Sequence, residues 1–309
     1  MLRVLTQVPI QLLGRVQREL PEVELVAIPM QGELPAEVCG DVLLTHAKGS
    51  ANLASVVARG VRWVHAYGTG VNEFPFDALG GRPLSCSRGS SAIPIAEWTL
   101  AVMLAAEKKL PASWIHEPPA HWSLGSLGGL YGKTLGIIGI GGIGQAVAAR
   151  ALPFGMRVRA LRRSDAPSPI AGVEIVRDLA DLLASADHLV VAAAATRATE
   201  RLLGDVAFAQ MKPGVHLVNV ARGALVDHEA LRGALGDGRV GLASLDCVDP
   251  EPLPAGHWLY THPRVRLSPH ISWSMPLAFD LLIEPFLENL RRDLRGEPLI
   301  HLVDRELGY

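Results

Sequence analysis

The sequence predicts an α/β protein with two doubly wound parallel sheets, each covered by helices. Short apolar runs alternate with segments of helical spacing along most of the chain, which is typical of parallel sheets. The alternation is interrupted by an irregular segment, residues 111–132, and starts again after Gly132. A length of 309 residues with 49% hydrophobic residues suits two domains of ordinary size, each with its own core.

The first alternation extends to about residue 90. A strand-like start, MLRVLTQ, is followed by expected helices and further strands. The segment IAEWTLAVMLAAEKK predicts a long helix, and Lys108 and Lys109 at its end complement the negative pole of the helix dipole. The expected strands are 23–28, 41–45 and 62–67, and the expected helices are 10–20, 51–59 and 95–109.

Residues 111–132 are rich in Pro, Gly, Ser and Trp and have no clear period. We interpret them as an irregular excursion, and an arm that grips a second subunit is one explanation for it.

The second alternation is cleaner and predicts six short strands joined by crossover helices. Such a doubly wound sheet binds nucleotides at the carboxyl ends of its strands. A final helix is expected at 276–294. The expected strands are 134–138, 157–161, 189–194, 215–220, 240–246 and 265–268, with helices at 142–152, 179–184 and 227–235.

Composition excludes several classes of protein. Lys and Arg number 29 against 31 Asp and Glu, so the chain lacks the basic excess typical of nucleic-acid binding. Cys39, Cys86 and Cys247 form no CxxC pair, and we expect buried thiols in a reducing compartment and no metal site. No apolar run has the roughly 20 residues needed to span a bilayer, so we expect a cytoplasmic protein without a membrane partner.

A glycine motif directly follows the strand expected at 134–138. Gly139, Gly141 and Gly144 stand in the G-x-G-x-x-G register, at the start of a helix. The first glycine permits a tight turn, the second lets the backbone approach a pyrophosphate, and the third lets the helix pack against the strand. The helix N-terminus supplies amide donors and positive dipole. The motif predicts a dinucleotide cofactor.

The strand at 157–161 ends without the acid that usually binds the ribose of NAD about 20 residues after the first glycine. Arg162, Arg163 and Ser164 stand there instead. Guanidinium groups suit a 2′-phosphate, whereas the simpler explanation is a solvated arginine pair on a loop. We predict NADP(H) in preference to NAD(H).

Three further segments resemble the D-isomer-specific 2-hydroxyacid dehydrogenase family, and its glyoxylate/hydroxypyruvate reductase-like branch in particular. They are VNVARGALVDHEAL around Arg222, LDCVDPEPLP around Glu251 and LSPHISWS around His270. Together with the glycine motif they cover most of residues 132–274 in the order that the family uses. The earlier segment HAYGTGVNEFP is similar to the family's substrate loop, although Asn72 stands where the family usually has an acid.

The resemblance implies a catalytic trio of Arg222, Glu251 and His270, and the residue types suit the reaction. Reduction of a 2-keto acid needs a proton donor, which an imidazole that titrates near neutrality can be. A carboxylate on the other ring nitrogen would orient the ring and help it hold its proton. A guanidinium would bind the carboxylate and polarise the carbonyl of the substrate.

Matching the family's motifs also implies further contacts. Lys48, Trp98 and Trp273 could line the pocket or serve only packing and solvation, and the sequence does not decide between these roles. The candidates for binding the substrate carboxylate are the backbone amides of Thr69 and Gly70. The implied cofactor contacts, besides the glycines and the arginine loop, are Gly142, Ile143, Thr196, Ala221 and Asp246.

On the family's plan, a Rossmann coenzyme domain at 93–276 is inserted into a flavodoxin-like substrate domain built from 1–92 and 277–309. The resemblance implies a homodimer and an NADP(H)-dependent reductase of a small 2-keto acid, glyoxylate or hydroxypyruvate first. Phosphoglycerate oxidation is a weaker alternative because we see no room for a regulatory domain and no phosphate cluster near Thr69. Formate oxidation is weaker still, because formate enzymes have Gln where this chain has Glu251. A cofactor-sensing protein without activity, like the co-repressors of this lineage, is the alternative from another class.

Overall fold

The computed structural model describes residues 1–309, and the chain divides into two compact units. One unit consists of Met1–Ser91 and Met275–Tyr309, and the other of Ala92–Ser274. The second unit is therefore inserted into the first, with boundaries one or two residues from the expected ones. Both units contain a parallel sheet with helices on its faces, so the predicted fold class is confirmed.

The first unit has a five-stranded parallel sheet in the order β2-β1-β3-β4-β5, the flavodoxin-like order. The strands are β1 (Leu2–Thr6), β2 (Val23–Ala27), β3 (Val42–His46), β4 (Trp63–Tyr67) and β5 (Leu84–Cys86), of which only β5 was not predicted. One face packs against α1 (Gly14–Glu19) and α8 (Ala278–Leu294), and the other against α2 (Leu53–Val57). Short 3-10 turns, η1 (Ile10–Leu13) and η2 (Phe76–Leu79), complete the unit.

The second unit has a seven-stranded parallel sheet in the order β12-β11-β10-β9-β6-β7-β8. Six of its strands were predicted. The seventh, β8, is an edge strand that pairs only with β7, and the prediction of six strands was wrong here. The strands are β6 (Thr134–Ile138), β7 (Arg157–Leu161), β8 (Val173–Val176), β9 (His188–Val191), β10 (Val215–Asn219), β11 (Val240–Leu245) and β12 (Val265–Leu267).

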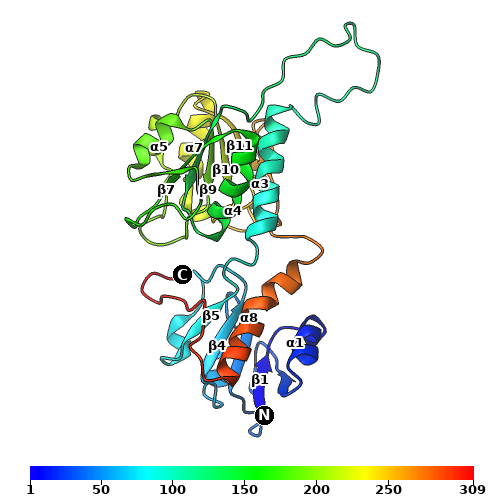
Figure 1. Ribbon diagram of the computed structural model, residues 1–309, viewed down its shortest axis with the longest axis vertical. Coiled ribbons are helices and arrows are strands. Elements are labelled where there is room, and N and C mark those ends of the chain that lie inside the picture. The colour runs from blue at the N-terminus through cyan, green and yellow to red at the C-terminus, as the bar shows by residue number, and fades with distance from the viewer. The chain divides into compact units, whose positions relative to one another are not determined.

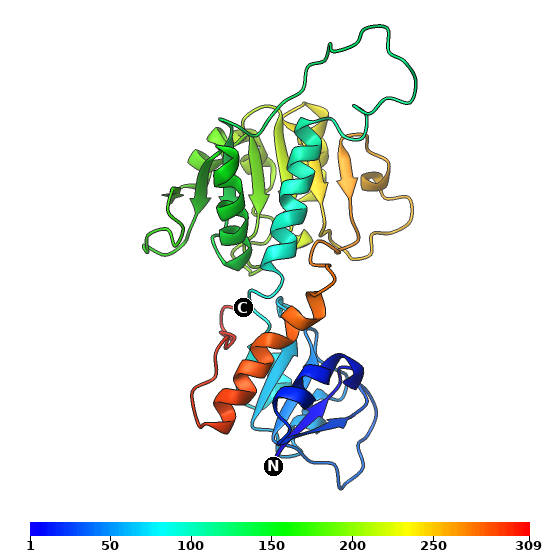
Figure 2. The ribbon, with the colours of Figure 1, turned by 45° about the vertical axis from the view of Figure 1, so that its right-hand side comes forward.

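Helices cover both faces of this larger sheet (Figures 1 and 2). The apolar core on one face includes α3 and α4, and the core on the other face includes α5, α6 and α7. Helix α6 was not predicted. The bounds are α3 (Ala92–Glu107), α4 (Gly142–Ala151), α5 (Leu179–Ser185), α6 (Asp205–Gln210) and α7 (His228–Gly236), with 3-10 turns η3 (Leu152–Phe154), η4 (Gly223–Leu225) and η5 (Trp258–Tyr260).

A buried chain of polar side chains crosses three strands beneath the end of α3. Glu107 is a carboxylate beside the Lys133 ammonium, and it accepts from His188 Nε2 at 3.0 Å. His188 Nδ1 must then accept from His216 Nδ1 at 3.1 Å, and His216 Nε2 accepts from the Ser244 hydroxyl at 2.9 Å. Burial lowers the pKa of His216 to about 3 and also lowers that of His188, so both rings are neutral.

The segment between α3 and β6 is irregular, as predicted, and residues 110–129, which we call the arm, extend away from the sheet (Figures 1 and 2). All side chains from 111 to 128 are exposed. Lys108 Nζ and Lys109 Nζ donate to the carbonyls of Gly128 and Ser126, which ties the arm's return to the end of α3.

Candidate functional site

The residues expected to act together in the second unit follow four strands of one sheet. The glycine motif follows β6, Arg222 follows β10, Glu251 follows β11, and His270 follows β12. All seven strands are parallel, so their carboxyl ends lie along the same edge. The fold therefore brings these four segments to one edge of the sheet.

The glycine turn has no room for side chains at two of its three glycines. Gly139 has a φ of 96°, and a Cβ on it would lie 2.8 Å from Ala193 Cα in the loop after β9. A Cβ on Gly144 would lie 2.1 Å from the Gly139 carbonyl oxygen, within the strand-to-helix crossing. These contacts give the first and third glycines the roles that the motif predicts.

The start of α4 is open to an anion. Gly141 precedes the helix in an extended conformation, and a Cβ on it would meet nothing within 4 Å. Gly142 is exposed and Ile143 is half-buried against the core, so the first amides of this ten-residue helix face accessible space. An N-terminus of this kind fits the pyrophosphate of a dinucleotide.

The loop after β7 carries the expected arginine pair. Gly139 N donates to the carbonyl of Leu161 at 3.1 Å, so Arg162 directly follows the strand end beside the glycine turn. Arg162 Nε donates to Ser164 Oγ at 2.8 Å, and Arg162 Nη1 donates to the Pro167 carbonyl at 2.6 Å. The guanidinium thus organises its own loop, while Arg163 and Ser164 are exposed.

Thr196 lies in the loop after β9, which touches the glycine turn through Ala193. Its amide donates to Thr199 Oγ1 at 2.8 Å, and Thr199 Oγ1 donates to the Ala194 carbonyl at 2.8 Å. The hydroxyl of Thr199 therefore shapes this loop.

Arg222 is held by its backbone between two neighbouring loops. Asn219 at the end of β10 donates through Nδ2 to the carbonyls of Arg222 at 3.0 Å and Cys247 at 3.3 Å. A Cβ on Gly223 would lie 1.9 Å from the Val248 carbonyl carbon, so the two loops meet here at backbone distance. Arg222 Nη1 donates to the buried Ala221 carbonyl at 2.7 Å. Sequence reasoning did not identify Asn219.

Glu251 and His270 form a hydrogen-bonded pair. His270 Nδ1 lies 2.9 Å from Glu251 Oε2, and Glu251 Oε1 accepts from the amide of Val248 at 3.1 Å. A carboxylate accepts the Nδ1 proton, which leaves Nε2 as the nitrogen able to exchange a proton with another molecule. Both side chains are about one third exposed, so the pair is reachable from outside.

Asp246 holds the loop that carries His270. Its carboxylate is 1% exposed and accepts from the Ser268 hydroxyl at 2.5 Å and from the amides of Ile271 at 2.9 Å and Ser272 at 3.0 Å. The Asp246 carbonyl accepts from the His270 amide at 3.0 Å. His270 has a φ of 55°, a conformation that costs a non-glycine residue free energy, and these bonds hold the loop in it.

The three residues whose role the sequence left open have partners in the structure. Trp273 Nε1 donates to the His270 carbonyl at 2.8 Å, and both Trp273 and Trp98 pack against the core beside α3 and α4. In the first unit, Lys48 forms an exposed ion pair with Glu73 at 2.8 Å, which fits a solvated lysine.

Thr69 and Gly70 follow β4 at the carboxyl end of the first unit's sheet. Thr69 Oγ1 donates to the Ser87 carbonyl at 3.2 Å, which fixes this loop, and both residues are half-buried. Their backbone amides donate no hydrogen bond within the structure, so both donors remain available.

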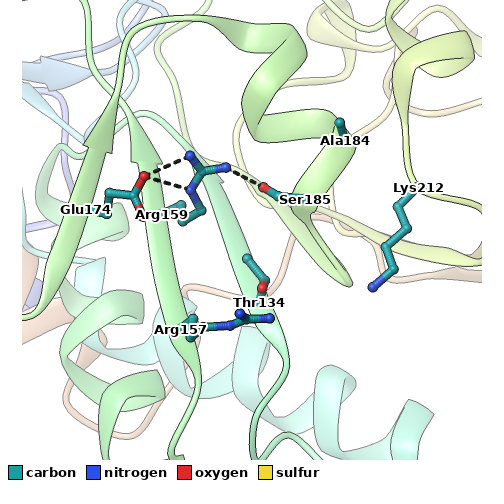
Figure 3. Close-up of a pocket in the computed structure, with 7 residues that line it drawn as sticks. All are labelled: Thr134, Arg157, Arg159, Glu174, Ala184, Ser185 and Lys212. Carbon is teal, nitrogen blue, oxygen red and sulfur yellow. Dashed lines mark hydrogen bonds and ion pairs between the residues drawn. The ribbon is translucent and has the colours of Figure 1, made fainter.

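A cavity of about 450 Å³ lies elsewhere in the second unit (Figure 3). It lies at the amino ends of β6, β7 and β8, opposite the glycine turn, because its lining includes Thr134, Arg157 and Glu174 from these three strands. Arg159 is paired there with Glu174 and Asp181, both at 2.8 Å. Arg159 is neutralised there by acids of the same unit, and we interpret this hollow as part of the sheet's surface.

The fold and this site define a class, the two-domain α/β proteins that bind a dinucleotide at a glycine turn. A family model described as "D-isomer specific 2-hydroxyacid dehydrogenase, NAD binding domain" matches residues 100–272. The chain belongs to the D-isomer-specific 2-hydroxyacid dehydrogenase family, so the resemblance inferred from the motifs is confirmed.

Curated relatives carry more than one name. A D-3-phosphoglycerate dehydrogenase of Methanocaldococcus jannaschii is 31% identical over 92% of this chain and 55% of its own length. A glyoxylate reductase/hydroxypyruvate reductase of Homo sapiens is 34% identical over 66% of this chain and 64% of its own length. The chain spans about half the length of the phosphoglycerate dehydrogenases that it matches.

Among solved structures, a D-isomer-specific 2-hydroxyacid dehydrogenase of Xanthobacter autotrophicus Py2, in complex with NADPH and MES, is similar with a TM-score of 0.82 and 26% identity. The similarity covers 100% of this chain and 99% of that one. An NADPH-dependent glyoxylate/hydroxypyruvate reductase of Sinorhizobium meliloti has a TM-score of 0.84 at 23% identity, over the whole of both chains, and shares the fold. No helix of this structure has both the length and the apolar character to cross a membrane, and a cytoplasmic location stays a prediction.

Proposed function

We propose that this protein is an oxidoreductase that transfers a hydride between NADP(H) and a small 2-keto or D-2-hydroxy acid. The observation that carries the proposal is the Glu251–His270 pair, 2.9 Å apart, on the sheet edge that also holds Arg222 and the glycine turn. A bound nicotinamide dinucleotide would supply or accept the hydride.

His270 acts as the acid–base catalyst through Nε2. In the reducing direction Nε2 gives its proton to the carbonyl oxygen of the substrate, and in the oxidising direction it takes the hydroxyl proton back. Glu251 fixes the ring through Nδ1 and balances the positive charge that the ring carries when both nitrogens are protonated. Arg222 binds the 2-keto carboxylate and stabilises negative charge on the carbonyl oxygen.

The unpaired amides of Thr69 and Gly70 suit the substrate carboxylate, and we assign them to it. This makes the first unit the substrate domain and the second the coenzyme domain. Gly142, Ile143, Thr196, Ala221 and Asp246 remain our assignments for cofactor contacts.

The test of the catalytic assignment is NADPH oxidation with a panel of 2-keto acids. Replacement of His270 by Ala should lower kcat by roughly 10²–10⁴-fold, the usual contribution of a general acid–base group. His262, which stands before β12 where His270 stands after it, supplies the matched control variant, His262→Ala. Wild-type rates in His270→Ala would refute the mechanism. Cofactor binding without turnover of any acid would favour the cofactor-sensing alternative.

NADP(H) is favoured because Arg162, and no carboxylate, directly follows the strand end beside the glycine turn. The measurement is the ratio of kcat/KM for NADPH and NADH. Arg162→Asp should shift that ratio toward NADH, whereas Arg157→Ala, at the amino end of the same strand, should leave it unchanged. A wild-type ratio near one, or one favouring NADH, would refute the preference.

Glyoxylate and hydroxypyruvate are our first candidates for the substrate, in line with the name of the human relative. The similarity to several phosphoglycerate dehydrogenases supports 3-phosphoglycerate as the second candidate. Adding 3-phosphoglycerate with oxidised cofactor to the panel separates the two, because kcat/KM should be highest for the true substrate class.

A homodimer formed through the coenzyme units would cover the arm. The arm and its base expose large side chains, including Trp114, Trp122 at 74% and Tyr131 at 87%, which a single chain leaves in water. Light scattering should give the mass of two chains, and Trp122→Asp should shift the equilibrium toward one. A monomeric wild-type protein would refute this assembly.

A further inference from the structure

A thiol lies beside the Glu251–His270 pair. The Cys247 sulfur, a Glu251 carboxylate oxygen and a His270 ring nitrogen all lie within 4.8 Å of one another. Cys247 is 1% exposed and forms no disulfide. The sequence predicted no metal site, because these residues come from two loops and match no ligand spacing.

Hydrogen bonds hold each of the three residues in place. Asn219 fixes the Cys247 carbonyl, and the Val248 amide fixes one oxygen of Glu251, which leaves Oε2 directed to His270. The bonds to Asp246 fix the loop of His270. A ligand set held in this way loses little conformational freedom when it binds an ion.

We infer that Cys247, Glu251 and His270 form a binding site for a soft divalent cation of the Zn²⁺ or Cd²⁺ type. One thiolate, one imidazole and one carboxylate are ligands that Zn²⁺ accepts, and three protein ligands leave a fourth position for water. The thiolate selects against Mg²⁺ and Ca²⁺, which prefer oxygen ligands.

The geometry needs only a small adjustment. Bonds of about 2.0–2.3 Å in a tetrahedron place ligand atoms roughly 3.5 Å apart, so the widest of the three separations must shorten by about 1 Å. Small rotations of the partly exposed Glu251 and His270 side chains close this separation, while the buried cysteine stays in place. Their exposure also leaves a path for the ion and for the water that completes its shell.

Binding of the cation requires the thiol to lose its proton to solvent. Burial raises the pKa of Cys247, and so do the negative charges of Asp246 and Glu251, whereas Arg222 lowers it. The unloaded site therefore holds a neutral thiol, and the cation's charge must favour the thiolate. His270 also faces the site and must offer a ring nitrogen that carries no proton.

A cation bound here separates Glu251 from His270 and occupies a nitrogen of the ring. On the proposed function, the ion is therefore an inhibitor of proton transfer. The ion-binding claim itself depends only on the three ligands, so binding and inhibition can be tested apart.

The experiment titrates the full-length protein, without substrate or cofactor, with Cd²⁺ and follows the ultraviolet charge-transfer absorption of the Cd²⁺–thiolate bond. One equivalent should bind in the wild type. Cys247→Val and Cys247→Ser should both abolish this absorption, because neither side chain offers a thiolate to the ion. Cys39→Ser, which removes the exposed thiol, is the matched control and should leave the titration unchanged.

Absorption that persists in both Cys247 variants, or that disappears in Cys39→Ser, would overturn the site. In parallel, Zn²⁺ should inhibit turnover of the wild type more strongly than that of Cys247→Ser. Cd²⁺ bound at Cys247 without inhibition would preserve the ion site and contradict the proposed role of the Glu251–His270 pair instead.

Discussion

Replacement of Asp246 by Asn tests whether this residue acts through the loop of His270. The carboxylate accepts three hydrogen bonds, from Ser268, Ile271 and Ser272, at 2.5–3.0 Å. An amide has one accepting oxygen, so a buried donor is left facing an NH₂ group. A buried donor without a partner costs about 1–3 kcal/mol, and we expect that loss in the free energy of unfolding.

The same change should lower kcat, because the left-handed backbone at His270 loses part of its support, and it should also raise the Kd of the cofactor, because Asp246 is among our assigned cofactor contacts. Urea unfolding, calorimetric titration of NADPH and steady-state kinetics measure the three quantities. The exposed Asp249 of the same loop gives the control variant Asp249→Asn. A raised cofactor Kd with unchanged stability and unchanged kcat would refute this reasoning and assign Asp246 to the nicotinamide carboxamide alone.

Two further predictions concern the glycine turn and the buried histidines. Gly144→Ala should lower the free energy of unfolding by about 3 kcal/mol, since its Cβ would lie 2.1 Å from the Gly139 carbonyl oxygen. Gly141→Ala should leave the free energy of unfolding unchanged and weaken cofactor binding. Equal unfolding midpoints for the two variants would contradict this. Burial lowers the pKa of His65 and of His216 to about 3, below the ordinary 6.5, so the unfolded chain binds protons first as pH falls. Stability should therefore drop below pH 6.5, by about 2 kcal/mol for each ring at pH 5, and a flat profile of urea midpoints from pH 7 to 5 would show that the rings are not buried and neutral.

Much of the coenzyme unit could be predicted because its signals are local. Two strands, β6 and β7, begin and end where the pattern places them, and the glycine motif lies in the expected turn. The edge strand β8 was missed because only one strand pairs with it and only its two end residues are buried, so it lacks the continuous apolar run of a central parallel strand.

The motifs identified the Glu251–His270 pair, but the groups that support it could not be predicted. These groups contact residues of other loops, and they are the three donors to Asp246, the side-chain amide of Asn219 and the thiol of Cys247. Their roles depend on distances between segments that are far apart in the chain, and residue spacing carries no information about such distances. The histidines of the buried polar chain gave no signal for the same reason.

The hydrogen bonds of the buried polar series from Ser244 to Glu107 all run in one direction. Because the Glu107 carboxylate can only accept, each hydrogen atom from Ser244 through both imidazoles has one possible position. Lys133 Nζ donates to the same Glu107 oxygen, which therefore accepts from both neighbours. One oxygen atom at the end of α3 thus decides which ring nitrogen of each histidine inside the sheet carries the proton.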